Sequence, residues 1–208
     1  MKDYYEQLWE RLPDELHPPE LELRARLLRN EIRPGDRVLD LGCGAGAFTQ
    51  IAADAGAGVA IGIEVAQAAI DRAKAEHPVL EFKLAPIDGP LPLQDASFDL
   101  VWASEVIEHV ADTAIWLSEV RRVIAPGGRL LLTTPAHGRL RLLLGGIERY
   151  SEPQGDHLHL YTARSLRALL EEFGFDNVRV EAASGPPLLR RTLSGRAVMP
   201  APGLSKDQ

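Results

Sequence analysis

The sequence predicts an α/β protein with a doubly wound, mostly parallel sheet of seven strands and helices on both faces. Short apolar runs alternate with segments whose apolar residues recur at helical spacing, and glycine and proline turn signals separate them. Such alternation requires crossover connections, which make the strands parallel and place helices on the faces of the sheet. The 208 residues are enough to build a hydrophobic core in one domain.

Two helices are expected before the first strand. Apolar residues recur at helical spacing over 3–12 and 19–31, and Pro18-Pro19 separates the two stretches. The aromatic residues of the first helix, Tyr4, Tyr5 and Trp9, are expected to dock it on the core rather than to cover a ligand pocket.

The remaining elements alternate along the chain. Pro34-Gly35 makes a turn before the first strand, and Pro126-Gly127-Gly128 is expected to stop a helix and turn into the fifth strand. The expected strands are 37–41, 59–63, 80–84, 98–103, 129–133, 178–182 and a seventh near 197–199. The expected helices run from Phe48 to a stop at Gly56 or Gly58, then over 66–76, 112–125 and 163–173.

This organisation corresponds to one domain over residues 1–200. Residues 1–33 would form an N-terminal helical cap, and 201–208 a disordered tail. The connection 136–161 is longer than most loops in compact domains, so we expect a lid with a short apolar helix around Leu140–Leu144.

Composition narrows the function classes. No apolar run approaches the ~20 residues of a membrane span, and the first residues lack an apolar signal core, so a cytoplasmic protein is expected. The formal charge of −7 argues against nonspecific nucleic-acid binding. The single cysteine, Cys43, argues against a disulfide framework or a cysteine-based metal site.

The glycine turn after the first strand is the most informative motif. It has the form Asp40-x-Gly42-x-Gly44-x-Gly46. Glycine has no Cβ, so a ligand can approach the backbone there. Dinucleotide-binding turns have the spacing G-x-G-x-x-G, whereas residue 47 is alanine. The spacing therefore argues against a nicotinamide dinucleotide.

This turn resembles the first motif of class I S-adenosylmethionine-dependent methyltransferases. The resemblance extends from about residue 35 to 182 and includes, in order, Ile61-Gly62-Ile63-Glu64, Leu91-Pro92, Asp95-x-x-Phe98-Asp99-Leu100-Val101, Glu105–Val110 and Ile124 before Pro126-Gly127-Gly128. It implies the Rossmann-like methyltransferase fold, S-adenosyl-L-methionine as cofactor, and methyl transfer to a small-molecule acceptor at oxygen by a monomer or homodimer.

The expected cofactor residues lie at the carboxyl ends of strands. Glu64, about twenty residues after the glycines, would accept hydrogen bonds from both ribose hydroxyls. The sequence departs from the family beside the adenine, because Ile87 stands where an acid is usual and Asp88 comes one residue later. The full set is Asp40, Gly42, Cys43, Gly44, Gly46, Glu64, Ile87, Asp88 and Ser104, in which Cys43 is a small buried residue and not a nucleophile.

A second chemical motif is Glu105-Val106-Ile107-Glu108-His109. In a helix, Glu105, Glu108 and His109 would share one face. Carboxylates and imidazoles together can hold a divalent ion. The pattern, followed by a later histidine, resembles metal-assisted O-methyltransferases, which implies Glu105, Glu108, His109 and His157 as ligands of Mg²⁺, Mn²⁺ or Zn²⁺. A metal would lower the pKa of the acceptor hydroxyl.

The same residues are consistent with other interpretations. His109 and Glu108 can act in catalysis without a metal, with His109 as general base, or His109 can be structural. His159 is expected to be a packing residue. An RNA 2′-O-methyltransferase and a noncatalytic module that binds S-adenosylmethionine are the alternative functions.

Overall fold

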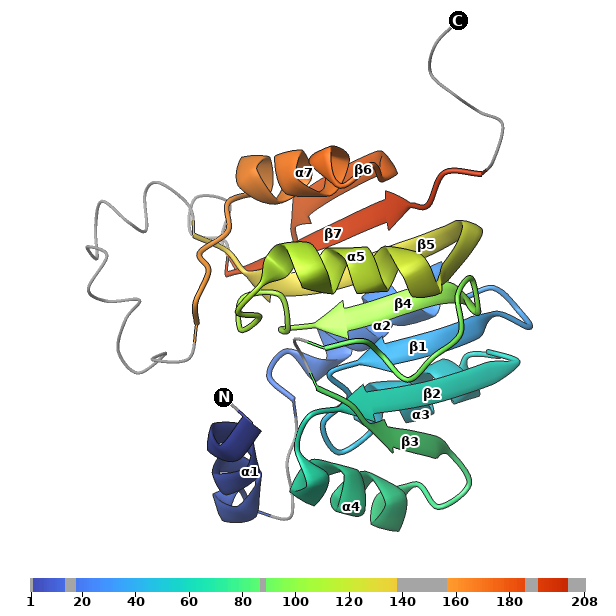
Figure 1. Ribbon diagram of the computed structural model, residues 1–208, viewed down its shortest axis with the longest axis vertical. Helices are drawn as coiled ribbons and strands as arrows, with labels where there is room; N and C mark the ends of the chain where they lie inside the picture. Colours follow the sequence, from blue (N-terminus) through green and yellow to red (C-terminus); the bar gives the residue numbers. More distant parts are fainter. Residues whose placement is uncertain (1, 14–17, 87–88, 138–156, 186–190, 202–208) are drawn as a thin grey trace, which may run out of the picture.

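The computed structural model describes residues 2–13, 18–86, 89–137, 157–185 and 191–201 (Figure 1). Ile87, Asp88, most of the expected lid and the tail from 202 onward lie outside these ranges. No helix in the described ranges combines the length and apolar character needed to cross a bilayer.

A single sheet of seven strands organises the chain. The strand order is β3-β2-β1-β4-β5-β7-β6, and all pairs are parallel except those of β7, which is antiparallel to both neighbours. The predicted mostly parallel sheet is therefore confirmed. The strands are β1 (Arg37–Leu41), β2 (Val59–Glu64), β3 (Glu81–Leu84), β4 (Phe98–Ser104), β5 (Ile124–Pro135), β6 (Asp176–Ala182) and β7 (Thr192–Val198).

Helices cover both faces of this sheet (Figure 1). Leu117 of α5 and Leu166 of α7 are buried in the core of one face, while Leu28 of α2 and Phe48 of α3 pack with Trp102 on the other. Apolar burial on both sides explains the apolar runs of the central strands. The helices are α1 (Lys2–Arg11), α2 (Leu21–Glu31), α3 (Ala47–Asp54), α4 (Gln67–Glu76), α5 (Thr113–Val123) and α7 (Ala163–Glu172).

Strand β5 is longer than the sequence predicts. Pro126-Gly127-Gly128, expected as a stop and turn, lies inside it. Gly127 N donates to Met199 O at 2.9 Å, and Met199 N donates to Gly128 O at 2.8 Å. Pairing with Met199, just after β7, therefore keeps this segment extended. Strand β7 is also longer than the short strand expected near 197–199, because Thr192–Val198 pairs with Arg129–Pro135 of β5.

A buried arginine joins α2 to the amino-terminal edge of the sheet. Arg129 Nε lies 2.9 Å from Glu31 Oε1, and Arg129 Nη2 contacts the carboxylate of Asp36. The arginine side chain is 3% exposed. Arg196, which is less buried, also binds Glu31, at 2.8 Å. These ion pairs fix α2 against β5 and β7.

We expect Arg129→Ala to lower the free energy of unfolding by about 3–5 kcal/mol, because it leaves two carboxylates without their buried partner. Arg196→Ala is the matched control and should cost roughly 1 kcal/mol or less, since its side chain is 31% exposed. Urea unfolding measures both. Equal losses for the two variants would contradict the role given to Arg129.

Candidate functional site

A cavity of about 260 Å³ opens where β1, β2 and β4 end. This is the edge at which open α/β sheets bind ligands. Gly42, Glu64 and Glu105 line it from the ends of these three strands, and Pro86 follows β3. Apolar side chains make up most of the remaining lining: Tyr5, Leu8, Trp9, Leu12, Leu41, Ile63, Val65, Ala85, Val106 and Trp116. The cavity thus combines an apolar interior with a few polar groups.

The glycine turn forms the floor of this cavity. Gly42 and Gly44 have φ values of +82° and +52°, which side chains rarely tolerate. A Cβ at Gly42 would overlap the side chain of Val106, and one at Gly44 would lie 3.0 Å from the Trp9 ring. Gly42 N donates to Ile63 O at 2.8 Å, which anchors the turn to β2. The absence of side chains lets Val106 and Trp9 approach the backbone of the turn, and Gly42 and Gly44 line the cavity.

Glu64 joins the end of β2 to this turn. Its Oε1 accepts from Val65 N at 2.6 Å, and its Oε2 accepts from Gly44 N at 3.1 Å. Only 9% of the residue is exposed, and burial raises the pKa of its carboxyl group. The two backbone donors hold the carboxylate against the cavity.

Four other expected cofactor residues lie behind the cavity lining. Asp40 accepts from Thr49 Oγ1 at 2.7 Å, and burial raises its pKa to about 7. Ser104 Oγ lies 3.0 Å from Thr133 Oγ1. Cys43 is buried in a small apolar cluster with Phe82, and Gly46 caps α3. These residues support the turn and the strand ends rather than line the cavity. Ile87 and Asp88 lie outside the described residues.

Helix α1 covers the cavity instead of docking on the core, so that expectation was wrong. Tyr5 and Trp9 line the cavity, whereas Tyr4 is 49% exposed. Helix α1 is attached to the amino end of α4, whose N-cap residue Ala66 has no capping side chain. Glu6 of α1 caps α4 instead, because its carboxylate accepts hydrogen bonds from the backbone N–H groups of Gln67 and Ala68, at 2.7 and 2.9 Å.

The amino end of α4 attracts the Glu6 carboxylate because it is the positive end of the helix dipole. Arg72 of α4 adds hydrogen bonds to the carbonyls of Leu12 and Pro13, at 2.7 and 3.0 Å. The guanidinium of Arg72 also lies over the Trp9 ring, at 5.9 Å from its centroid. Polar contacts with α4 therefore determine where α1 lies (Figure 1).

The segment Glu105–His109 is a turn and not a helix, which corrects the sequence prediction. Glu105 has a φ of +55° and its N–H donates to Thr133 O at 2.9 Å, continuing the pairing of β4 with β5. His109 N donates to Val106 O at 2.9 Å and closes the turn. Glu105 therefore shares no helical face with Glu108 and His109.

Glu105 instead pairs with Arg24 of α2. Arg24 Nη2 lies 3.4 Å from Glu105 Oε2. Arg24 is 6% exposed, and its Nε and Glu105 Oε1 are buried without a hydrogen-bond partner among the described residues. Sequence reasoning missed Arg24. The sequence feature that could have identified it is an arginine next to the apolar face of α2, between Leu21 and Leu28.

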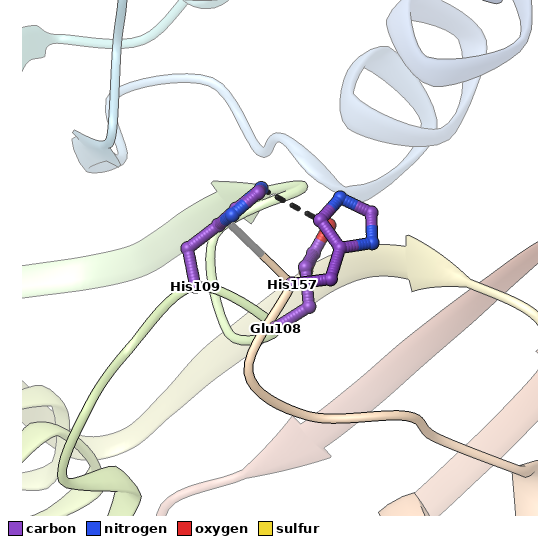
Figure 2. Close-up of side chains that lie close together, drawn as sticks. All are labelled: Glu108, His109 and His157. Atoms are coloured by element: carbon purple, nitrogen blue, oxygen red, sulfur yellow. Dashed lines mark ion pairs between the residues drawn. The ribbon is translucent and has the colours of Figure 1, made fainter. Parts of the chain in front are cut away.

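Glu108, His109 and His157 form the second polar group of the site (Figure 2). One ligand atom from each residue lies within 4.8 Å of the others. Glu108 Oε1 is 3.8 Å from His109 Nε2, and the rings of His109 and His157 are 4.5 Å apart between centroids. Three of the four residues expected at a metal site therefore lie together, and Glu105 does not join them.

The chemistry of this group follows from its burial. Glu108 is fully buried, and its Oε2 accepts from Thr134 Oγ1 at 2.9 Å. Burial and the nearby Glu105 raise the pKa of Glu108 to about 8. Its Oε1 accepts no hydrogen bond within the described part of the chain and lies beside the two imidazoles. An orphaned carboxylate oxygen next to two nitrogen donors fits a divalent ion.

The sequence is similar to a known protein family and to individual methyltransferases. Residues 8–180 match the family described as "Methyltransferase domain". A probable S-adenosylmethionine-dependent methyltransferase of Mycolicibacterium smegmatis is 35% identical over 142 residues, which are 68% of this chain and 52% of that protein. A malonyl-[acyl-carrier protein] O-methyltransferase of Erwinia billingiae is 36% identical over 102 residues, 49% of this chain and 40% of that protein.

Solved structures agree with the fold. The crystal structure of an S-adenosylmethionine-dependent methyltransferase from Mesorhizobium loti has a TM-score of 0.68 and 24% identity, and the match covers 85% of this chain and 97% of that one.

The sequence matches span about a third to a half of the length of the curated relatives. Three of these relatives are covered over 32%, 52% and 40% of their length.

The contacts of Glu6 generate a prediction. Glu6→Ala should remove the cap shared by α1 and α4 and lower the local stability of α1 by about 1 kcal/mol, roughly a fivefold change in opening. Hydrogen exchange over residues 2–11 measures this. Glu10→Ala, an exposed acid on the same helix, is the control. Equal exchange in the two variants would show that Glu6 does not hold the helix.

Proposed function

Because the chain belongs to the class I S-adenosylmethionine-dependent methyltransferase family, we propose that it transfers the cofactor's methyl group to a hydroxyl oxygen of a small-molecule acceptor. The observation that carries this proposal is the proximity of Glu108 and His157 to His109, which lines the cavity. O-Methyl transfer needs a group that removes the hydroxyl proton, and an imidazole beside a carboxylate can do so.

We assign the cofactor to the cavity between the glycine turn and α1. The backbone of Gly42 and Gly44 would lie against it, and the carboxylate of Glu64 would accept hydrogen bonds from the ribose. Arg24 and Glu105 would bind the amino-acid end, because their buried and incompletely bonded charges match its carboxylate and ammonium groups. S-Adenosylmethionine supplies an activated methyl group on a sulfonium.

The acceptor would lie beneath α1 and next to His109. Tyr5 meets the His109 ring edge-on, with 6.1 Å between centroids, and Leu8 lines the same cavity. These surroundings favour an apolar or aromatic molecule that carries a hydroxyl group. A relative that methylates oxygen supports the same acceptor atom. The net charge of −7 disfavours RNA.

The chain's residues then have separate tasks in an in-line displacement. The strand ends and α1 align the acceptor with the methyl group and exclude water. Without a metal, His109, which lines the cavity, accepts the hydroxyl proton, while Thr134 orients Glu108 behind it. With a metal, Glu108, His109 and His157 would instead hold the divalent ion, which when bound supplies a positive charge that lowers the pKa of the acceptor hydroxyl.

Cofactor binding provides the first test. S-Adenosylhomocysteine should bind with a Kd on the order of micromolar, which corresponds to a binding free energy of about −8 kcal/mol. Glu64→Ala should weaken binding at least tenfold, about 1.4 kcal/mol, because the ribose hydroxyls lose their acceptor. Calorimetry measures both values, with Glu81→Ala on β3 as an exposed control. Binding of a nicotinamide dinucleotide in place of S-adenosylhomocysteine would refute the assignment.

The second test concerns Glu108, His109 and His157. His109→Ala should lower turnover by roughly 10²–10⁴, the range for a positioned proton acceptor. A panel of phenols, catechols and aliphatic alcohols with methyl-labelled cofactor supplies the assay. Chelation should abolish turnover and Mn²⁺ should restore it, with little change in cofactor affinity. Turnover that survives chelation but not His109→Ala would leave His109 as the base and remove the metal. Near-normal turnover of folded His109→Ala would overturn both roles.

A further inference from the structure

A short strap, residues 157–161, crosses the turn that follows β4. The N–H groups of Leu158 and His159 both donate to Glu108 O, at 2.8 and 3.0 Å. At the other end of the strap, His137 N donates to Tyr161 O at 2.9 Å, next to the isolated bridge between Ala136 and Tyr161. The strap is thus fixed both to the turn that carries Glu108 and to the end of β5.

The side chain of His159 adds a third attachment. Its Nε2 lies 2.9 Å from Val110 O and 3.3 Å from Thr113 Oγ1. A carbonyl oxygen can only accept, so Nε2 carries the hydrogen and donates to Val110 O. Val110 ends the turn that contains Glu108 and His109, and Thr113 begins α5. The imidazole therefore connects the strap to the same turn as the backbone bonds do.

Exposure alternates along the strap. Leu158 and Leu160 are 51% and 38% exposed, whereas Tyr161 is buried and the two histidines are partly buried. The less exposed residues His157 and His159 therefore face the body of the protein, and a one-residue slip would place Leu158 where His157 now meets His109.

We propose that His159 is a positioning residue that holds the strap in register and thereby keeps the His157 ring beside Glu108 and His109. This inference rests on the proposed function, which gives His157 its task. It replaces the packing role expected from the sequence. The backbone bonds to Glu108 O tie the strap to the turn, and the side-chain bond to Val110 O determines which residue of the strap faces the two other groups.

The test uses three variants of the whole chain. His159→Ala removes the donor. His159→Gln retains one, because its terminal amide nitrogen reaches about as far as Nε2 and can donate to Val110 O. Leu158→Ala is the control, since it trims an exposed neighbour and keeps both backbone bonds. Thermal unfolding of all three variants shows whether each remains folded.

Two readouts follow the position of His157. In the metal-free protein, an NMR nuclear Overhauser effect should join the His109 and His157 rings, whose centroids are 4.5 Å apart. We expect it to vanish in His159→Ala and to persist in His159→Gln and Leu158→Ala. Mn²⁺ affinity should fall about 10–100-fold in His159→Ala, as for other groups that orient metal ligands, and recover in His159→Gln.

Each outcome decides a separate point. An unchanged ring contact in folded His159→Ala overturns the positioning role, and so does an equal loss of that contact in the alanine and glutamine variants. Wild-type protein that binds no Mn²⁺ overturns the metal part of the proposed function only. The ring contact is measured without metal, so the positioning role is still decided in that case.

Discussion

The parallel pairing of β4 with β1 and β5 determines where the rest of the site lies. Asp40 of β1 pairs with Trp102, and Ser104 pairs with Thr133 of β5, so the three strands reach their carboxyl ends together. Trp102 is fully buried and packs with Leu28 and Phe48 on one face of the sheet, which holds this register. The glycine turn after β1 and the acid–histidine turn after β4 consequently border one cavity.

Four acidic side chains lie at or near these strand ends, where burial removes part of the water that would solvate their charges. Asp40, Glu64, Glu105 and Glu108 are largely buried, and burial raises the pKa of each. Hydroxyl and backbone N–H groups donate hydrogen bonds to Asp40, Glu64 and Glu108 and replace part of the lost hydration. Arg24 lies against Glu105. A ligand with positive charge offsets the remaining repulsion. A sulfonium cofactor and a divalent ion both have that charge, so one electrostatic feature supports both parts of the proposed chemistry.

Two segments complete the site from outside the sheet, and polar contacts attach both. Glu6 binds the amino end of α4 and places α1 above the cavity. The carbonyl of Glu108 accepts two N–H groups of the strap and brings His157 to the cluster. Hydrogen bonds of this kind specify direction and register more narrowly than apolar contact does. That precision suits residues that must meet a ligand at defined atoms.

The sequence by itself determined the sheet, the glycine turn and the place of Glu64. Each depends on local patterns: apolar runs between turn signals, glycines at fixed spacing, and an acid at a strand end. It also predicted that Glu108, His109 and His157 would meet. Only the tertiary structure decided that Glu105 turns away toward Arg24, that α1 lies on α4, and that His159 bonds to Val110 O. These arrangements depend on partners distant in the chain, and a left-handed residue at Glu105 breaks the helical spacing from which its place was inferred.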